Sequence, residues 1–244
     1  MANIEEMNKW SYLEAWKFFT KNAFNRFIPE TELYLRSLNF CVTKDIRDDK
    51  NADKIILESL NKKSLILIDG CSLNGKTTLG KRLSNHIQAS IVDIDLICKE
   101  WIEQYLVKST NPIDKFSFIN EMDKLTDVYI LENLEKIIKE KSQKGNVILV
   151  GCYMELIYRS IIVKTLGKYF DQVVSIYCCA KSFNEIIKMK KKRDIEFGFS
   201  GETDEEILNQ YIYSKNLLEY EGIMLGLGMG ASFITDNSVS DIFA

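Results

Sequence analysis

The residues whose types and spacing most clearly suit a chemical function form a glycine-rich stretch directly after an apolar run at 64–69. The stretch matches the pattern GxxxxGK followed by Ser or Thr, in which two glycines let the backbone fold tightly and turn its N–H groups toward phosphate oxygens. Lys76 would bring a cation to the β- and γ-phosphates, and the Thr77 hydroxyl suits a Mg²⁺ ligand. The predicted nucleotide-binding residues are Gly70, Cys71, Ser72, Leu73, Asn74, Gly75, Lys76, Thr77 and Thr78. We therefore expect a site for a nucleoside triphosphate, with ATP and Mg²⁺ as its occupants.

Two carboxylates follow the next apolar run, in the segment Ile91-Val92-Asp93-Ile94-Asp95. If the strand continues through residue 95, its period of two places Asp93 and Asp95 on one face. A site for phosphate chemistry needs one carboxylate near the metal and a second that accepts a proton from an attacking hydroxyl. We predict Asp93 as the metal-side carboxylate and Asp95, further along the chain, as the catalytic base. The alternative is that the pair caps the following helix.

A basic run between 188 and 193 is the third candidate for chemistry. Phosphoryl transfer asks the protein chiefly for positioning and for positive charge around the migrating group. Arg193 is the best single candidate for a catalytic cation, because a guanidinium grips phosphate bidentately. The alternative for the run as a whole is a solvated helix face. Its members are Lys188, Lys190, Lys191, Lys192 and Arg193.

The composition narrows the chemistry further. The chain has 244 residues with 46% hydrophobic and 27% charged, which is typical of a globular protein with a full core. A net charge of −3 argues against a protein that coats nucleic acid. The six cysteines form no CxxC pair and His86 is the only histidine, so a zinc site is not expected and the base must be a carboxylate.

The elements that must position these residues alternate between strand and helix from residue 64 onward. Apolar runs predict buried parallel strands, and the stretches between them predict helices. This alternation indicates a three-layer α/β P-loop fold with a parallel sheet, in which ligands bind at the carboxyl ends of the strands. The predicted strands are 64–69, 89–94, 146–150, 172–178 and 232–235, and the predicted helices are 77–88, 122–143, 153–166 and 181–194.

We divide the chain into a helical N-terminal extension at 1–62 and a P-loop domain at 63–244, whose lid covers about 188–216. Aromatic residues recur at helical spacing between Tyr12 and Phe27, and we expect this stripe to pack on the α/β body or on a second subunit to make a homodimer. No apolar run reaches the length of about 18 residues that a membrane-spanning helix needs, and the first residues lack the pattern of a secretion signal. The expected location is the cytoplasm, with no membrane partner.

The segment after the fourth predicted strand reads Lys192-Arg193-Asp194-Ile195-Glu196-Phe197-Gly198-Phe199-Ser200 and continues with Glu206-Ile207-Leu208-Asn209-Gln210-Tyr211 and Tyr220. It resembles the lid of the uridine kinase and phosphoribulokinase group of P-loop kinases, in which RD-I-x-x-x-G-R-S is followed by Q-Y. The resemblance covers about 64–237. It implies a nucleoside-kinase-like fold and transfer of the ATP γ-phosphate to a hydroxyl of a small molecule such as a nucleoside. Asp95 would fall at the catalytic aspartate of that group and Arg193 at a lid arginine.

The sequence departs from that group at two positions. Phe199 stands where the lid usually has arginine, and Gly151 stands where the third strand is usually followed by glutamate. The segment 92–97 is closer to the pattern D-x-D-x-I-E of shikimate- and gluconate-type kinases. A non-nucleoside acceptor (shikimate-, gluconate- or pantothenate-like) is therefore an alternative.

Other functions share the phosphate loop but predict different motifs. A GTP-hydrolysing switch would carry DxxG and NKxD, and a motor ATPase would have a strand ending in Asp-Glu, whereas strand 146–150 is followed by Gly151 and Cys152. A regulatory module that binds nucleotide without turnover is a third hypothesis, favoured by the departures at Phe199 and Gly151. A nucleic-acid end kinase is a fourth hypothesis, against which the overall acidity argues.

Overall fold

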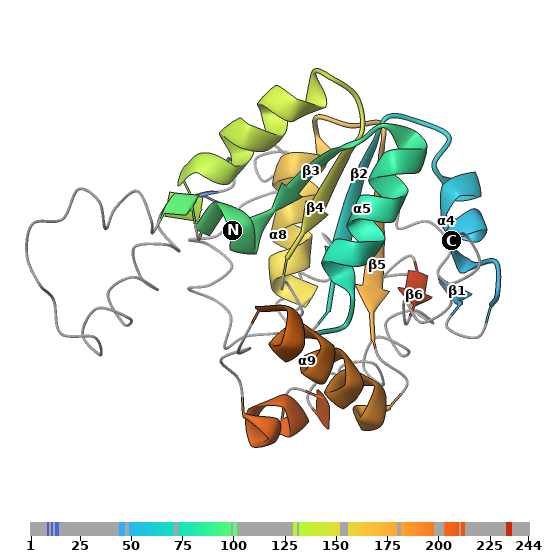
Figure 1. Ribbon diagram of the computed structural model, residues 1–244. Helices are drawn as coiled ribbons and strands as arrows, with labels where there is room; N and C mark the ends of the chain where they lie inside the picture. Colours follow the sequence, from blue (N-terminus) through green and yellow to red (C-terminus); the bar gives the residue numbers. More distant parts are fainter. Residues whose placement is uncertain are drawn as a thin grey trace, which may run out of the picture.

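Six parallel strands form the centre of the described part of the chain (Figure 1). The computed structural model describes residues 9, 11, 13–14, 44–46, 49–70, 73–98, 100–101, 129–130, 132–151, 156–179, 182–197, 203–209, 211–212 and 233–235. The strands are β1 (Lys44–Asp45), β2 (Ser64–Asp69), β3 (Ser90–Asp93), β4 (Val147–Val150), β5 (Gln172–Cys178) and β6 (Phe233–Thr235). They are ordered β1-β6-β5-β2-β4-β3 and every neighbouring pair is parallel.

This order puts β2 in the middle, between β4 on one side and β5 on the other. β4 and β3 therefore lie on one side of β2, and β5, β6 and β1 on the other; in open α/β sheets ligands bind at the carboxyl ends of the strands where the order divides in this way. All five predicted strands are confirmed to within a residue at each end. They were recognisable because buried parallel strands read as continuous apolar runs, as in the fully buried β2 and β4.

The labelled helices are α4 (Ala52–Ser59), α5 (Lys76–Ile87), α8 (Leu156–Gly167) and α9 (Phe183–Phe197). Further helical segments cover 94–98, 132–142 and 204–209. The helices predicted at 77–88, 153–166 and 181–194 are confirmed with shifts of up to three residues, and 132–142 lies inside the helix predicted at 122–143. None of the helices in this part of the chain combines the length and apolarity of a membrane span.

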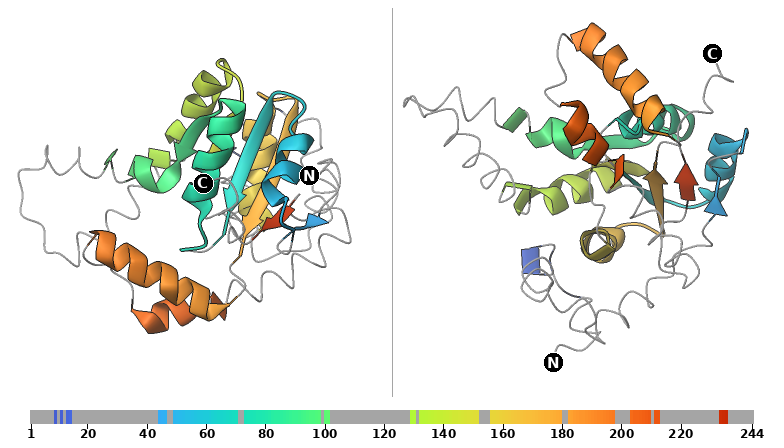
Figure 2. Two further views of the ribbon diagram at one scale, coloured as in Figure 1. Left: turned by 45° about the vertical axis from the view of Figure 1, so that its right-hand side comes forward. Right: turned by 90° about the horizontal axis from the view of Figure 1, so that it is seen from below.

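The alternation of side chains along β2 divides the core into two layers. Leu65 and Leu67 face α8 and the helix at 132–142, whereas Ile66 and Ile68 face α4 and α5. All four side chains are fully buried, and each such burial stabilises the fold by about 1.5–3 kcal/mol. Helices therefore cover both faces of the sheet (Figure 2), and the prediction of a three-layer α/β P-loop fold is confirmed.

Two elements of the predicted N-terminal extension pack into this same core. β1 pairs with β6, and α4 buries Ile56 against the face of the sheet that α5 covers. Asp53 of α4 accepts two hydrogen bonds from the Arg82 guanidinium of α5, at 2.9 and 3.0 Å. β1 was not among the predicted strands, because its pairing with β6 is made by tertiary contact and leaves no apolar run in the sequence. The aromatic stripe, and with it the predicted dimer contact, lies outside the described residues apart from 13–14.

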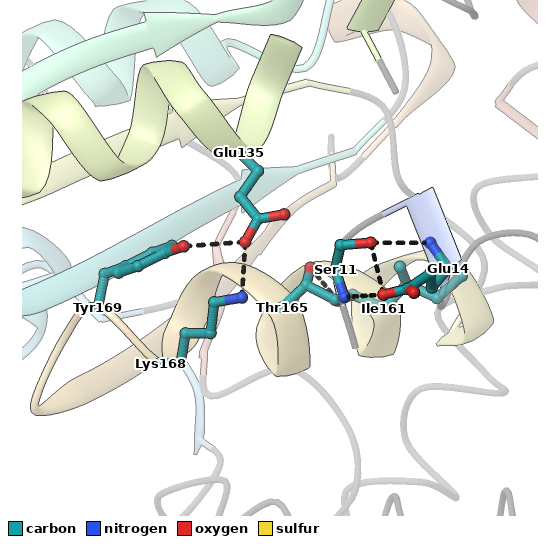
Figure 3. A network of polar contacts seen from close by, with 7 residues as sticks. All are labelled: Ser11, Glu14, Glu135, Ile161, Thr165, Lys168 and Tyr169. Carbon is teal, nitrogen blue, oxygen red and sulfur yellow. Dashed lines mark hydrogen bonds and ion pairs between the residues drawn. The ribbon is translucent and has the colours of Figure 1, made fainter. Parts of the chain in front are cut away.

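A polar network fastens the helix at 132–142 to the turn after α8 (Figure 3). Glu135 Oε1 accepts hydrogen bonds from Lys168 Nζ at 2.6 Å and from the Tyr169 hydroxyl at 2.9 Å. The same view includes a reciprocal pair in which Ser11 N–H and Oγ donate to Glu14 Oε2 at 2.7 and 2.8 Å. This pair has the form of a helix-starting capping box.

Candidate functional site

The phosphate loop has the backbone that its glycines predict. Gly70 has φ +135°, and a Cβ added there would lie 2.2 Å from the carbonyl oxygen of Cys178 at the end of β5. Gly75 is left-handed at φ 78° and forms the N-cap of α5. A side chain is therefore excluded at Gly70 both by backbone conformation and by contact.

The loop delivers its functional side chains at the first turn of α5. Lys76 begins the helix and is 9% exposed, while Thr77 and Thr78 are exposed. The unpaired N–H groups and the dipole of a helix N-terminus favour an anion at this end. Cys71 and Ser72 lie outside the described residues. The described loop residues thus surround the position that a phosphate chain would take in such a motif.

Asp93 contacts two segments: Thr77, directly after the phosphate loop, and the helical segment 94–98, directly after Asp93 itself. Its Oδ2 accepts a hydrogen bond from Thr77 Oγ1 at 3.2 Å, and its Oδ1 accepts one from Leu96 N–H at 3.3 Å. The second contact is the capping interaction that the sequence left open as an alternative. The first spans the sheet, because β4 lies between the strand of Asp93 and the strand that feeds the loop.

Asp95 does not lie on a strand, so the prediction from period-two alternation is wrong for this residue. β3 ends at Asp93, and residues 94–98 are helical because the Asp93 carboxylate caps a new turn. Asp95 nevertheless lies within electrostatic reach of Lys76 and Asp93. Burial by the surrounding protein raises the pKa of Asp95 although part of its side chain meets solvent; Lys76 opposes this rise and Asp93 adds to it.

The Thr77 hydroxyl and the Asp93 carboxylate form a donor set that fits Mg²⁺, a hard cation that takes oxygen ligands. Within the described residues no group of three or more His, Cys, Asp or Glu side chains could hold a metal ion. If Mg²⁺ binds at this site, Thr77 and Asp93 are the described side chains that would hold it.

The basic run lies on α9, which crosses below the carboxyl ends of the strands (Figure 1). Lys188, Lys191 and Lys192 are exposed, in accord with the alternative of a solvated face. Lys190 forms an ion pair with Asp204 at 3.3 Å. Residue 193 belongs to α9, but the Arg193 side chain and residues 198–202, including Phe199, lie outside what the structure describes.

Sequence reasoning missed two contacts of the loop itself. Leu73 has φ 63°, an uncommon left-handed conformation for a leucine, and its side chain packs on residues of α9 and of 204–212. Asn74 is buried, and its Nδ2 donates to the Cys178 carbonyl at 3.2 Å. Both residues occupy variable positions of the GxxxxGK pattern, so no signal in the motif pointed to them.

The Cys178 thiol, at the end of β5, is buried beside the phosphate loop. Burial raises the pKa of Cys178 to about 12, so its thiol stays protonated at neutral pH. Cys179 is also buried and Cys98 is half-buried, and none of the three forms a disulfide. The two buried cysteines, Cys178 and Cys179, pack as small apolar side chains.

A central strand that feeds a phosphate loop into a helix, inside a parallel sheet covered on both faces, defines an α/β P-loop NTPase fold. No protein-family model matches the sequence, and a search of the curated proteins finds no match.

Distant likenesses occur among solved structures. A chain of the PezAT toxin–antitoxin system of Streptococcus pneumoniae is 17% identical with a TM-score of 0.46, covering 78% of this chain and 77% of that one. Shikimate kinase from Bacteroides thetaiotaomicron is 15% identical with a TM-score of 0.39, covering 73% and 90%. Shikimate kinase from Acinetobacter baumannii in complex with shikimate is 12% identical with a TM-score of 0.40, covering 73% and 86%. At such low identities and TM-scores these likenesses add no weight to a function, which has to come from the residues of this chain.

Proposed function

We propose that this protein is an ATP-dependent phosphotransferase that moves the γ-phosphate of ATP to a hydroxyl of a small molecule. The observation that carries the proposal is the hydrogen bond between Thr77 of the phosphate loop and Asp93 at the end of β3. It brings Asp93 beside the first turn of α5, where a nucleotide's terminal phosphate would lie, and Asp95 lies within electrostatic reach of Lys76 and Asp93. A loop for phosphate and a separate carboxylate, Asp95, for a hydroxyl proton are the two parts that such a transfer needs.

In the proposed reaction, the acceptor oxygen forms a bond to the γ-phosphorus while the bond from that phosphorus to the β,γ-bridging oxygen breaks, leaving ADP. Asp95 takes the proton of the acceptor hydroxyl, and Lys76 balances negative charge on the phosphates. Thr77 and Asp93 would hold Mg²⁺, which when bound shields the charge of the β- and γ-phosphates. Arg193 on α9 is proposed as a further cation that binds the phosphates.

The acceptor is proposed to lie beside Asp95, next to the helical segment at 94–98. The lid resemblance favours a nucleoside. The segment around Asp93 and Asp95 favours a smaller polyhydroxylated acid of the kind that shikimate and gluconate represent. Both classes present a hydroxyl that a raised-pKa carboxylate can deprotonate as the bond to phosphorus forms.

The proposal is tested by ADP release from MgATP in the presence of nucleosides, sugars, shikimate, gluconate and pantothenate. Lys76→Ala serves as the blank, and Lys81→Ala is the matched control because Lys81 is an exposed lysine further along the same helix. We expect acceptor-dependent ADP from one class, lost by about 10²–10³-fold in Lys76→Ala, the range for removal of one electrostatic stabiliser, and kept in Lys81→Ala. Tight ATP binding with no ADP from any acceptor would favour the regulatory module instead.

As pH is lowered, turnover is expected to decline at a higher pH than it would if the catalytic base were an aspartate of ordinary pKa. The base works only when ionised, and burial raises the pKa of Asp95 above 3.8. Activity is therefore full above the raised pKa and declines about tenfold per pH unit below it. The measurement is kcat/KM across the acid range, with circular dichroism at each pH as a check on folding. If the residual activity of Asp95→Asn declined at low pH in the same way, the decline would belong to the titration of another group.

A further inference from the structure

We propose that Leu73 is a positioning residue that couples the phosphate loop to α9, so that binding of phosphates fixes where the helix with the basic run lies. This inference rests on the proposed phosphoryl transfer. It concerns a hydrophobic cluster separate from the two large core clusters. Its members, which we call the lid-base cluster, are Leu73, Phe183, Ile186, Ile187, Ile207 and Tyr211.

The first step is that α9 and the segment 204–212 form one unit. Ile186 of α9 and Ile207 of the second segment are the buried members of this cluster, with 2% and 1% of their surfaces exposed. The rings of Phe183 and Tyr211 lie 5.9 Å apart. The ion pair of Lys190 with Asp204 closes the other end. We call this pair of helical segments the α9 unit.

The second step is that the α9 unit reaches the phosphate loop through Leu73. Neither large core cluster includes an α9 residue within the described part of the chain. Among those same residues, Leu73 is the one member of the lid-base cluster that belongs to neither segment of the α9 unit. Its apolar side chain is therefore a direct packing contact through which a movement of the loop reaches the unit.

The third step is the conformation of Leu73 itself. At φ 63° a glycine or asparagine would carry little strain, whereas a leucine is strained in this sparsely populated backbone region. Such a residue persists when its surroundings compensate, and here the compensation is the packing on the α9 unit. The strained backbone and the cluster therefore support each other.

The fourth step is the neighbouring residue. Asn74 donates to the carbonyl of Cys178, the last residue of β5, and the chain runs from there into α9. Two consecutive loop residues thus hold the α9 unit, one by packing on its helices and one by fixing the strand that leads into it. A loop clamped around phosphates would therefore hold α9, and with it the lysines and Arg193, in one place.

The test compares Leu73→Gly with Leu73→Met. Glycine relieves the left-handed backbone, keeps the backbone N–H of the loop and removes the side chain; methionine keeps an apolar contact of similar volume. Leu208→Ala is the control, because Leu208 lies on the same segment as Ile207 but is 39% exposed and outside the cluster. The measured quantity is amide hydrogen exchange of 183–197 with and without the β,γ-imido analogue of ATP and Mg²⁺.

We expect the analogue to slow exchange in α9 by about tenfold, within the range typical of coupling between sites, in the wild type, Leu73→Met and Leu208→Ala. Leu73→Gly is compared at analogue concentrations that calorimetric titration shows to saturate it, and there the analogue should leave α9 exchange nearly unchanged. Equal protection of α9 in Leu73→Gly, or none in the wild type with the analogue bound, would overturn the coupling. Protection without acceptor-dependent ADP from any compound would overturn the proposed function and leave the coupling standing.

Discussion

Asp95→Asn is expected to lower acceptor-dependent ADP release by about 10²–10⁴-fold, the usual contribution of a general base. The amide cannot take the proton of the acceptor hydroxyl. ATP affinity should be unchanged or higher, because a negative charge within reach of Lys76 disappears. Single-turnover kinetics and calorimetric titration with ATP measure the two quantities separately.

The same variant should not be less stable at neutral pH, which separates lost chemistry from lost folding. Because burial raises the pKa of Asp95, the folded state binds its proton more tightly than the unfolded state does. Folding stability therefore falls as pH rises from 3.8 through the raised pKa, and asparagine removes this loss. Asp171→Asn is the matched control, because Asp171 is an exposed aspartate directly before β5, at the amino end of that strand and away from the site. Wild-type turnover in Asp95→Asn would show that another group accepts the proton.

Gly70→Ala is expected to lower the free energy of unfolding by about 3 kcal/mol or more and to abolish ATP binding, since it combines backbone strain with overpacking. The added Cβ would meet the Cys178 carbonyl oxygen at 2.2 Å, and that oxygen belongs to a strand in the centre of the sheet. Neither the strand nor the loop can move away without breaking the pairing of β2 with β5. Urea denaturation and ATP titration measure the outcome.

Gly145→Ala is the control that separates the effect of the contact with Cys178 from the effect of the strained backbone at positive φ. Gly145 has φ +128°, close to that of Gly70, but a Cβ there meets nothing within 4 Å. We expect this change to cost only about 1–3 kcal/mol, from the backbone conformation alone, with ATP binding intact. If Gly70→Ala behaved like Gly145→Ala in both measurements, the close approach of the loop to β5 would not be what holds it.

The five strands from residue 64 onward were predictable to within a residue because each contains an apolar run; β2, β4 and β5 lie inside the sheet, and β3 at its edge still carries Ile91 and Val92. The exception is β1, which consists of Lys44 and Asp45 and has no such pattern. It pairs with β6 only because the rest of the sheet presents an open edge there. Its existence is a consequence of assembly, and no local signal marks it.

The candidate site divides in the same way. Positions whose role depends on the backbone over a few residues, such as Gly70, Gly75 and Lys76, could be assigned from the motif, because the glycine conformations and the start of α5 are local properties. The strand-end carboxylates could be named but not placed. Asp93 ends its strand by capping a helix, and this local competition put Asp95 on a helix and not on the expected strand.

The amino-acid sequence alone was sufficient for the fold class, the order of strands and helices along the chain and the phosphate loop, since hydrophobic period and glycine spacing act over short distances. The meeting of Thr77 with Asp93 across β4, and of Leu73 with α9, required the order of the strands in space. That order is set by which apolar faces pack together over the whole sheet, a long-range property that no single segment encodes.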